Sequence, residues 1–63
     1  MRKTVTKGNR AVIISANDAT GPFHANLYVN YVNENELGDI TLIRNKFKTL
    51  AGALRWADKQ LAA

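Results

Sequence analysis

The 63-residue sequence contains no cysteine and only one histidine, His24, so two common means of stabilising a small domain are absent. Without cysteine there is neither a disulfide nor a thiolate metal site, and one histidine cannot form a histidine-rich zinc site. A chain of this length buries only about 60% of its unfolded surface. We therefore expect one domain, residues 1–63, that depends on good local order or on self-association.

Long apolar segments are also missing. The longest unbroken apolar run is Ala11 to Ile14, far short of the roughly 20 residues that span a bilayer. The basic N-terminus precedes a strand-like run rather than the continuous apolar segment of a signal peptide. Because the absence of cysteine suits a reducing compartment, these features predict a cytoplasmic protein that does not enter a membrane.

Motifs of catalysis are absent as well. The four glycines are scattered and form no nucleophile elbow, P-loop or dinucleotide-binding motif. Asp18 and His24 are the one candidate acid–base pair, but a turn-capping Asp18 and a strand-edge His24 are the favoured roles. The chain is also short for a substrate pocket of about 300–1,000 Å³. We expect no catalysis, no cofactor and no small-molecule substrate.

Acidic residues gather in one loop, where Glu34 and Glu36 are followed by Asp39. Carboxylates attract hard cations, but an EF-hand needs a longer and more regular series of oxygen ligands. We interpret this loop as a solvated acidic turn and expect no metal.

Three segments predict β-strands. The run "AVIIS" within residues 4–16 is β-branched and apolar, and residues 23–32 alternate apolar and polar side chains. Residues 39–45, "DITLIRN", place Ile40 and Leu42 on one face and Thr41 and Ile43 on the other. The segment "KGN" at 7–9 is a bulge, a bend or a turn, and we expect the first strand to start only at Arg10, after a loose basic arm. Loops at 17–22 and 33–38 separate the strands, and Pro22 ends ladder pairing in the first loop.

The segment "TLAGALRWADKQLAA" predicts a C-terminal helix with Thr49 as its N-cap. Its apolar stripe consists of Leu50, Leu54, Ala57 and Leu61. Trp56 lies at the margin of this stripe. We expect it to cover the edge of the core, in preference to the alternative role of anchoring a contact with a partner.

The order of elements predicts an α+β fold, a three-stranded antiparallel meander sheet with the C-terminal helix packed on one face (β-β-β-α). Phe47 closes the end of the core. The other residues expected under the helix are Phe23, Leu27, Val29, Tyr31, Ile40, Leu42 and either Val12 with Ile14 or Ala11 with Ile13.

The uncovered sheet face is the candidate binding surface, and its first candidate partner is nucleic acid. The net charge is +4, with nine Lys and Arg against five Asp and Glu, which favours attraction to polyanions. Tyr28 and His24 can stack on bases, and asparagines can bind base edges. The candidate binding residues are Arg10, His24, Asn26, Tyr28, Asn30, Ile43, Arg44, Lys46 and Lys48.

A protein partner, including a second copy in a homodimer, is the alternative on the same face. Tyr28, Ile43 and one apolar register of the first strand, surrounded by asparagines, resemble the composition of an interface. The acidic 33–39 segment favours this alternative, because it repels phosphate at one end of the sheet. Both partners remain open at this point.

The segment "FKTLAGALRWADKQL" resembles the helix of several small helix-on-sheet modules. The order of three strands and a helix is similar to that of plant AP2-type DNA-binding domains and of the arm-binding domains of phage integrases, which read DNA through the sheet. The resemblance covers topology, since their base-reading Arg and Trp positions do not map onto this chain. In size the chain also resembles compact accessory proteins of phages and mobile elements, including anti-CRISPR inhibitors.

Overall fold

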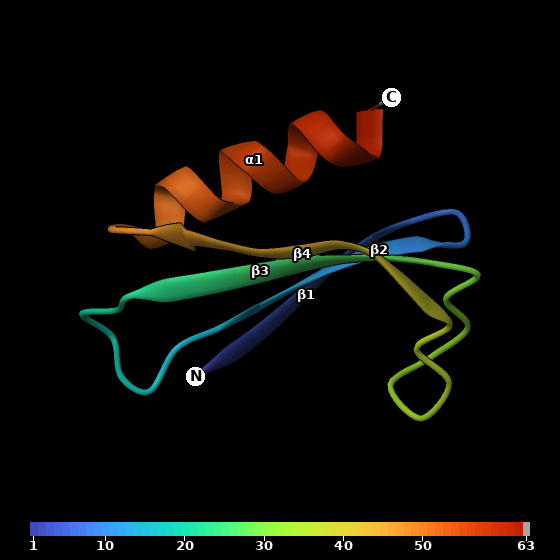
Figure 1. Cartoon of the computed structure of the whole chain (residues 1–63), viewed down its shortest axis with the longest axis horizontal. Helices are drawn as coiled ribbons and strands as arrows, with labels where there is room; N and C mark the ends of the chain where they lie inside the picture. The colour runs from blue at the N-terminus through green and yellow to red at the C-terminus, as the bar shows by residue number, and fades with distance from the viewer. Residues whose placement is uncertain (63) are drawn as a thin grey trace.

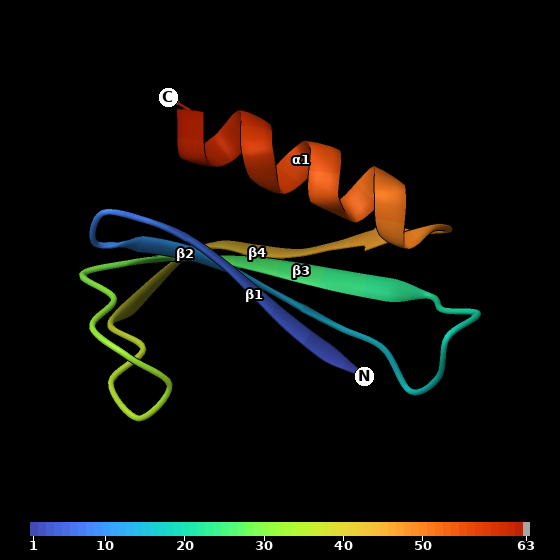
Figure 2. The same cartoon turned by 180° about the vertical axis from the view of Figure 1, so that it is seen from behind.

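A computed structural model describes residues 1–62 of the chain, apart from the side chains of residues 42–45. The elements in that part are β1 (Arg2–Lys7), β2 (Arg10–Ser15), β3 (Phe23–Val29), β4 (Asp39–Phe47) and α1 (Leu50–Ala62). The strands form one antiparallel sheet in sequential order, with the helix over one face (Figures 1 and 2). The predicted α+β class, with a meander and a C-terminal helix, is confirmed, but the described sheet has four strands rather than three.

The additional strand is β1, which pairs with β2 from Arg2 opposite Ser15 to Lys7 opposite Arg10. A two-residue turn joins the strands, and Gly8 occupies its first position with a φ of 61°. Glycine adopts this backbone conformation without the steric cost that other residues meet, which favours a tight hairpin. The basic N-terminal segment is therefore an edge strand, and the expected loose arm is wrong.

The second predicted strand is shorter than expected, because β3 ends at Val29. Asn30 has a φ of 58°, a left-handed conformation that interrupts an extended strand. The next residue, Tyr31, donates its backbone N–H to the carbonyl of Asn9 at 2.7 Å. Tyr31 therefore lies in a loop beside the β1–β2 turn. Its predicted place on the strand under the helix is wrong.

The helix starts as predicted, with the Gly52 backbone N–H donating to Thr49 Oγ1 at 3.1 Å. Its buried line consists of Ala53, Ala57 and Leu61, and Leu50 and Leu54 are only partly buried beside it. The buried stripe is therefore rotated from the predicted one towards the alanines, whose small side chains allow a close approach to the sheet. No helix within residues 1–62 is long and apolar enough to cross a membrane.

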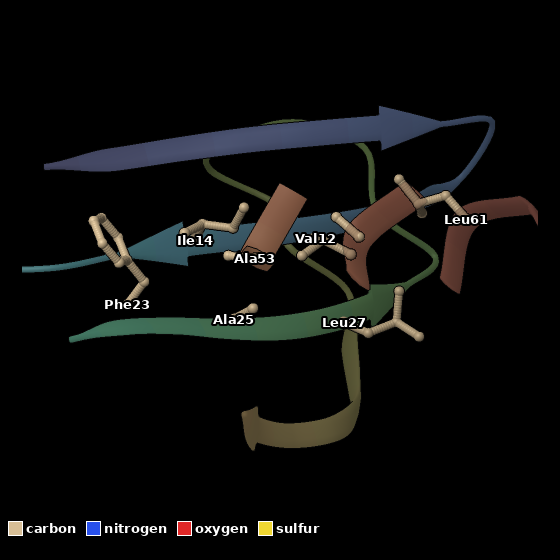
Figure 3. Packing of buried hydrophobic residues seen from close by; sticks show 8 residues of the cluster. Val12, Ile14, Phe23, Ala25, Leu27, Ala53 and Leu61 are labelled. Atoms are coloured by element: carbon tan, nitrogen blue, oxygen red, sulfur yellow. The ribbon is translucent and has the colours of Figure 1, made fainter. Parts of the chain in front are cut away.

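The core lies between α1 and the two central strands (Figure 3). Of the two registers left open for β2, the one facing the helix is that of Val12 and Ile14, both fully buried. At one end the rings of Phe47 and Trp56 lie 5.9 Å apart, and both pack against the core as predicted. The remaining members of the buried cluster are Phe23, Ala25, Leu27, Ala53, Ala57 and Leu61.

Ile40 was expected in this core, and that prediction is wrong. The pairing of β3 with β4 shifts register twice, between Ala25 and Leu27 and between Leu27 and Tyr28. These shifts place Ile40 opposite Tyr28, on the face away from the helix, where it is 50% exposed. The side chain of Leu42, another predicted core residue, lies outside the described part.

Candidate binding site on the open sheet face

The sheet face opposite α1, called here the open face, is the candidate site. The connections over residues 16–22 and 30–38 project from the sheet on this side (Figures 1 and 2). Residues directly opposite each other in an antiparallel ladder point to the same face. The strand pairing therefore defines which side chains form rows across the open face.

The row nearest the 16–22 connection crosses all four strands and is entirely polar. Arg2 pairs with Ser15, Ser15 with His24, and His24 with Lys46. Arg2 and Lys46 are exposed at the two sheet edges, whereas Ser15 and His24 are partly buried between them. This polar row places two cations around two hydrogen-bonding side chains.

The row at the other end of the open face is mainly apolar. It consists of Thr6, Ala11, Tyr28 and Ile40. Ala11 is fully buried and Tyr28 partly buried, and Ile40 forms the exposed edge. Polarity therefore changes along the strands, from the polar row to this apolar row.

Among the side chains that the structure describes, His24 Nδ1 and Asn26 Oδ1 on the open face are enclosed by the protein and have no hydrogen-bond partner. Both atoms belong to alternate residues of β3 that point to this face.

The connection between β3 and β4 returns towards β1 on this face. Glu34 forms an ion pair with Arg2, with Oε2 3.3 Å from an Arg2 guanidinium nitrogen. Its other oxygen, Oε1, accepts a hydrogen bond from Thr4 Oγ1 at 2.9 Å. No local sequence pattern indicates this contact, because the partners are about thirty positions apart. One acidic side chain thus offsets the cation at the β1 edge.

Four of the nine predicted binding residues come together on the open face: His24, Asn26, Tyr28 and Lys46. Arg10 does not join them, because it shares the register of Val12 and donates a hydrogen bond to the backbone carbonyl of Leu61 on the helix side.

The other predicted residues lie at the margins. Asn30 is in the turn after β3 and donates to Asp39 Oδ2 at 3.1 Å, and Lys48 is exposed just beyond β4. The side chains of Ile43 and Arg44 lie outside the described part of the chain.

A small pocket adjoins the polar row, with a volume of about 130 Å³. Its lining residues are Ser15, Ala16, Asn17, Pro22 and His24. Ser15 was missed as a site residue, although its alternation with Ala11 and Ile13 in β2 was the signal that places it on this face.

Asp18 follows the pocket residue Asn17 in the 16–22 connection. Its carboxylate accepts hydrogen bonds from the Thr20 hydroxyl and from the Thr20 backbone N–H. These bonds, the hydroxyl first, lower the pKa of the Asp18 carboxyl below its ordinary value. Asp18 is thus engaged within its own turn. Among the residues that the structure describes, no group of three or more His, Asp or Glu side chains is placed to hold a metal ion.

Comparisons of this chain with protein-family models, curated proteins and solved structures found no match. Evidence for function therefore comes from the geometry of the chain itself.

Proposed function

We propose that this chain is a small, non-catalytic, cytoplasmic binding protein that holds nucleic acid against its open face. The observation that carries the proposal is the polar row, in which Arg2 and Lys46 flank Ser15 and His24. Arg, Lys and Ser side chains are typical donors to phosphate oxygens, and these contacts position a protein on a nucleic acid. The net charge of +4 favours the same partner.

The remaining side chains of this face extend the proposed interface. Tyr28 lies two positions beyond Asn26 on β3 and is partly exposed, so its ring is available for stacking on a base. Lys48 adds a further exposed cation just past Lys46. Phosphate contacts are thereby expected at one end of the face and stacking towards the other.

Fluorescence anisotropy with a labelled oligonucleotide tests this proposal. Each phosphate contact releases counterions, so affinity should fall steeply as salt increases. At low salt, Lys46→Glu should weaken binding by about tenfold. The matched control is Lys7→Glu, which makes the same charge change on an exposed side chain in the helix-side register of β1. Equal effects of the two variants would show that binding depends only on the net charge of the chain. No binding by the wild type would contradict the proposed function.

A protein partner is the second candidate, and the apolar row supports it. Tyr28 and Ile40 lie opposite each other, and Val32 in the following loop is 65% exposed. Such apolar and aromatic groups are suited to an interface centre. A phage-type accessory or inhibitor function would use this end of the open face.

Pairing of sheet edges is a poor route for such an assembly. The β1 edge carries Arg2, Lys3 and Lys7, and β4 pairs irregularly with β3; charged and bulged edges both oppose strand addition. Self-association is therefore expected through the open face. Sedimentation velocity of the wild type, Tyr28→Ala and Ile40→Asp tests it: a dimer lost in both variants supports it, and a wild-type monomer contradicts homodimer formation.

A further inference from the structure

If the proposed nucleic-acid function holds, the pocket beside the polar row indicates whether a single strand or a duplex is bound. We infer that it receives one unstacked base of a single strand. The pocket lies between the end of β2, the start of the 16–22 connection and the start of β3, and Ser15 and His24 belong both to its lining and to the polar row.

The size of the pocket limits what can enter. Its volume of about 130 Å³ is close to that of an engineered cavity of about 150 Å³ that binds benzene. It is well below the roughly 300–1,000 Å³ of pockets that enclose drug-sized ligands. A single six-membered ring fits this volume, whereas a whole nucleotide does not.

The lining has the chemistry of a base-binding site. The His24 imidazole offers a planar ring for stacking, and Pro22 supplies an apolar wall. Ser15 carries a hydroxyl and Asn17 a carboxamide, and both groups donate to and accept from base edges. His24 Nδ1 is enclosed, so contact with a ligand falls to the other parts of the ring.

The surroundings of the pocket suit the backbone on either side of such a base. Lys46 lies opposite His24, and Arg2 lies opposite Ser15. Cations are therefore present on both sides of Ser15 and His24. The phosphates on either side of a bound base would pass these cations. In a duplex every base is stacked and paired, so occupying the pocket requires a single strand.

The test compares one labelled strand, alone and annealed to its complement, by fluorescence anisotropy. The single strand should bind about tenfold more tightly than the duplex. Removing bases from the strand, with an abasic backbone of equal length, should abolish that advantage. Amide resonances of Asn17 and His24 should shift when the single strand is added to labelled protein.

Variants distinguish the pocket from the rest of the open face. Ser15→Val removes the hydroxyl and narrows the pocket, and it should lower single-strand affinity about fivefold. Duplex affinity should fall by less, because a duplex loses only the contact of the hydroxyl with a phosphate. Thr6→Val is the matched control, because it changes an exposed hydroxyl residue on the same face in the apolar row. Asn17→Ala, in the exposed connection, provides a second pocket variant should Ser15→Val fail to fold, and the same direction of change is expected.

The outcomes separate this inference from the proposed function. One outcome would contradict base binding in the pocket and leave nucleic-acid binding in place. In that outcome single strand and duplex bind equally, neither pocket variant changes affinity, and Lys46→Glu clearly lowers it. Absence of binding to either form would overturn both. A single-strand preference that disappears in the pocket variants and persists in Thr6→Val would support the inference.

Discussion

Arg10 at the start of β2 donates a hydrogen bond from its guanidinium group to the backbone carbonyl of Leu61, 2.8 Å away in the last turn of α1. The last carbonyls of a helix have no partner within the helix, and the C-terminus carries a partial negative charge. The guanidinium satisfies one of these carbonyls and complements that charge. It thereby joins two residues that are 51 positions apart in the sequence.

Replacing this arginine should lower stability rather than oligonucleotide affinity. Arg10→Met keeps much of the aliphatic side chain but removes the donor, and the free energy of unfolding should fall by about 1–2 kcal/mol. Urea denaturation followed by far-UV circular dichroism measures the change. Lys7→Met, at the exposed residue opposite Arg10, should be nearly neutral. A loss of nucleic-acid affinity in Arg10→Met with unchanged stability would contradict this assignment.

Two turn glycines should respond very differently to the same substitution. Gly38 has a φ of 79°, and a Cβ there would lie 2.2 Å from the carbonyl oxygen of Val29. Gly8 has a φ of 61° with nothing within 4 Å of its Cβ position. We expect Gly8→Ala to cost about 1 kcal/mol from backbone strain alone. Gly38→Ala should cost well over twice that, because a backbone clash is added.

Thermal unfolding of the two glycine variants measures this difference. Because both replacements add one methyl group at a left-handed position, their comparison isolates the clash with the backbone of Val29 and Asn30. Similar unfolding temperatures for the two variants would show that the 30–38 connection adjusts without cost.

Local patterns were sufficient to predict the helix, its Thr49 cap and the fold class. These features depend on neighbours within one or two turns, which the sequence displays directly. The first strand was harder, since "RKTVTK" offers only Val5 as an apolar contact and reads equally well as a solvated arm. Its pairing depends on a tight turn at Gly8, whose conformation "KGN" permitted but did not require.

The candidate site was predictable only in part, for three physical reasons. Arg10 shares its register with the buried Val12 and Ile14, so its side chain faces the helix and not the open face. The exposure of Ile40 depends on shifts in strand pairing that alternation cannot show. The contact of Glu34 with β1 depends on the path of a loop, which is set by tertiary structure.

The alanines of α1 give a test of helix-to-sheet packing. Ala57 is fully buried between the helix and the sheet, whereas Ala51 is exposed in the first turn. Enlarging the buried residue should strain the core, so Ala57→Leu is expected to cost about 1–3 kcal/mol. Ala51→Leu should change stability by less than about 0.5 kcal/mol. Urea midpoints compare the two, and an unaffected Ala57→Leu would mean that the helix shifts freely on the sheet.

Glu34 should oppose nucleic-acid binding, because it offsets the charge of Arg2 at the edge of the polar row. Glu34→Gln removes the negative charge but keeps a carbonyl oxygen that can accept the Thr4 hydroxyl. An exposed ion pair contributes about 0–1 kcal/mol, so stability should change little, and oligonucleotide affinity at low salt should rise by about two- to fivefold.

Glu36→Gln provides the control for net charge, since it makes the same change two positions away in the same exposed loop. Anisotropy titrations at two salt concentrations should show the larger gain for Glu34→Gln, and the gain should diminish as salt rises. Equal gains in both variants would mean that the charge of the loop as a whole, rather than the Glu34–Arg2 contact, governs binding. A decrease in affinity for Glu34→Gln would instead indicate that this contact holds the open face in the form that binds.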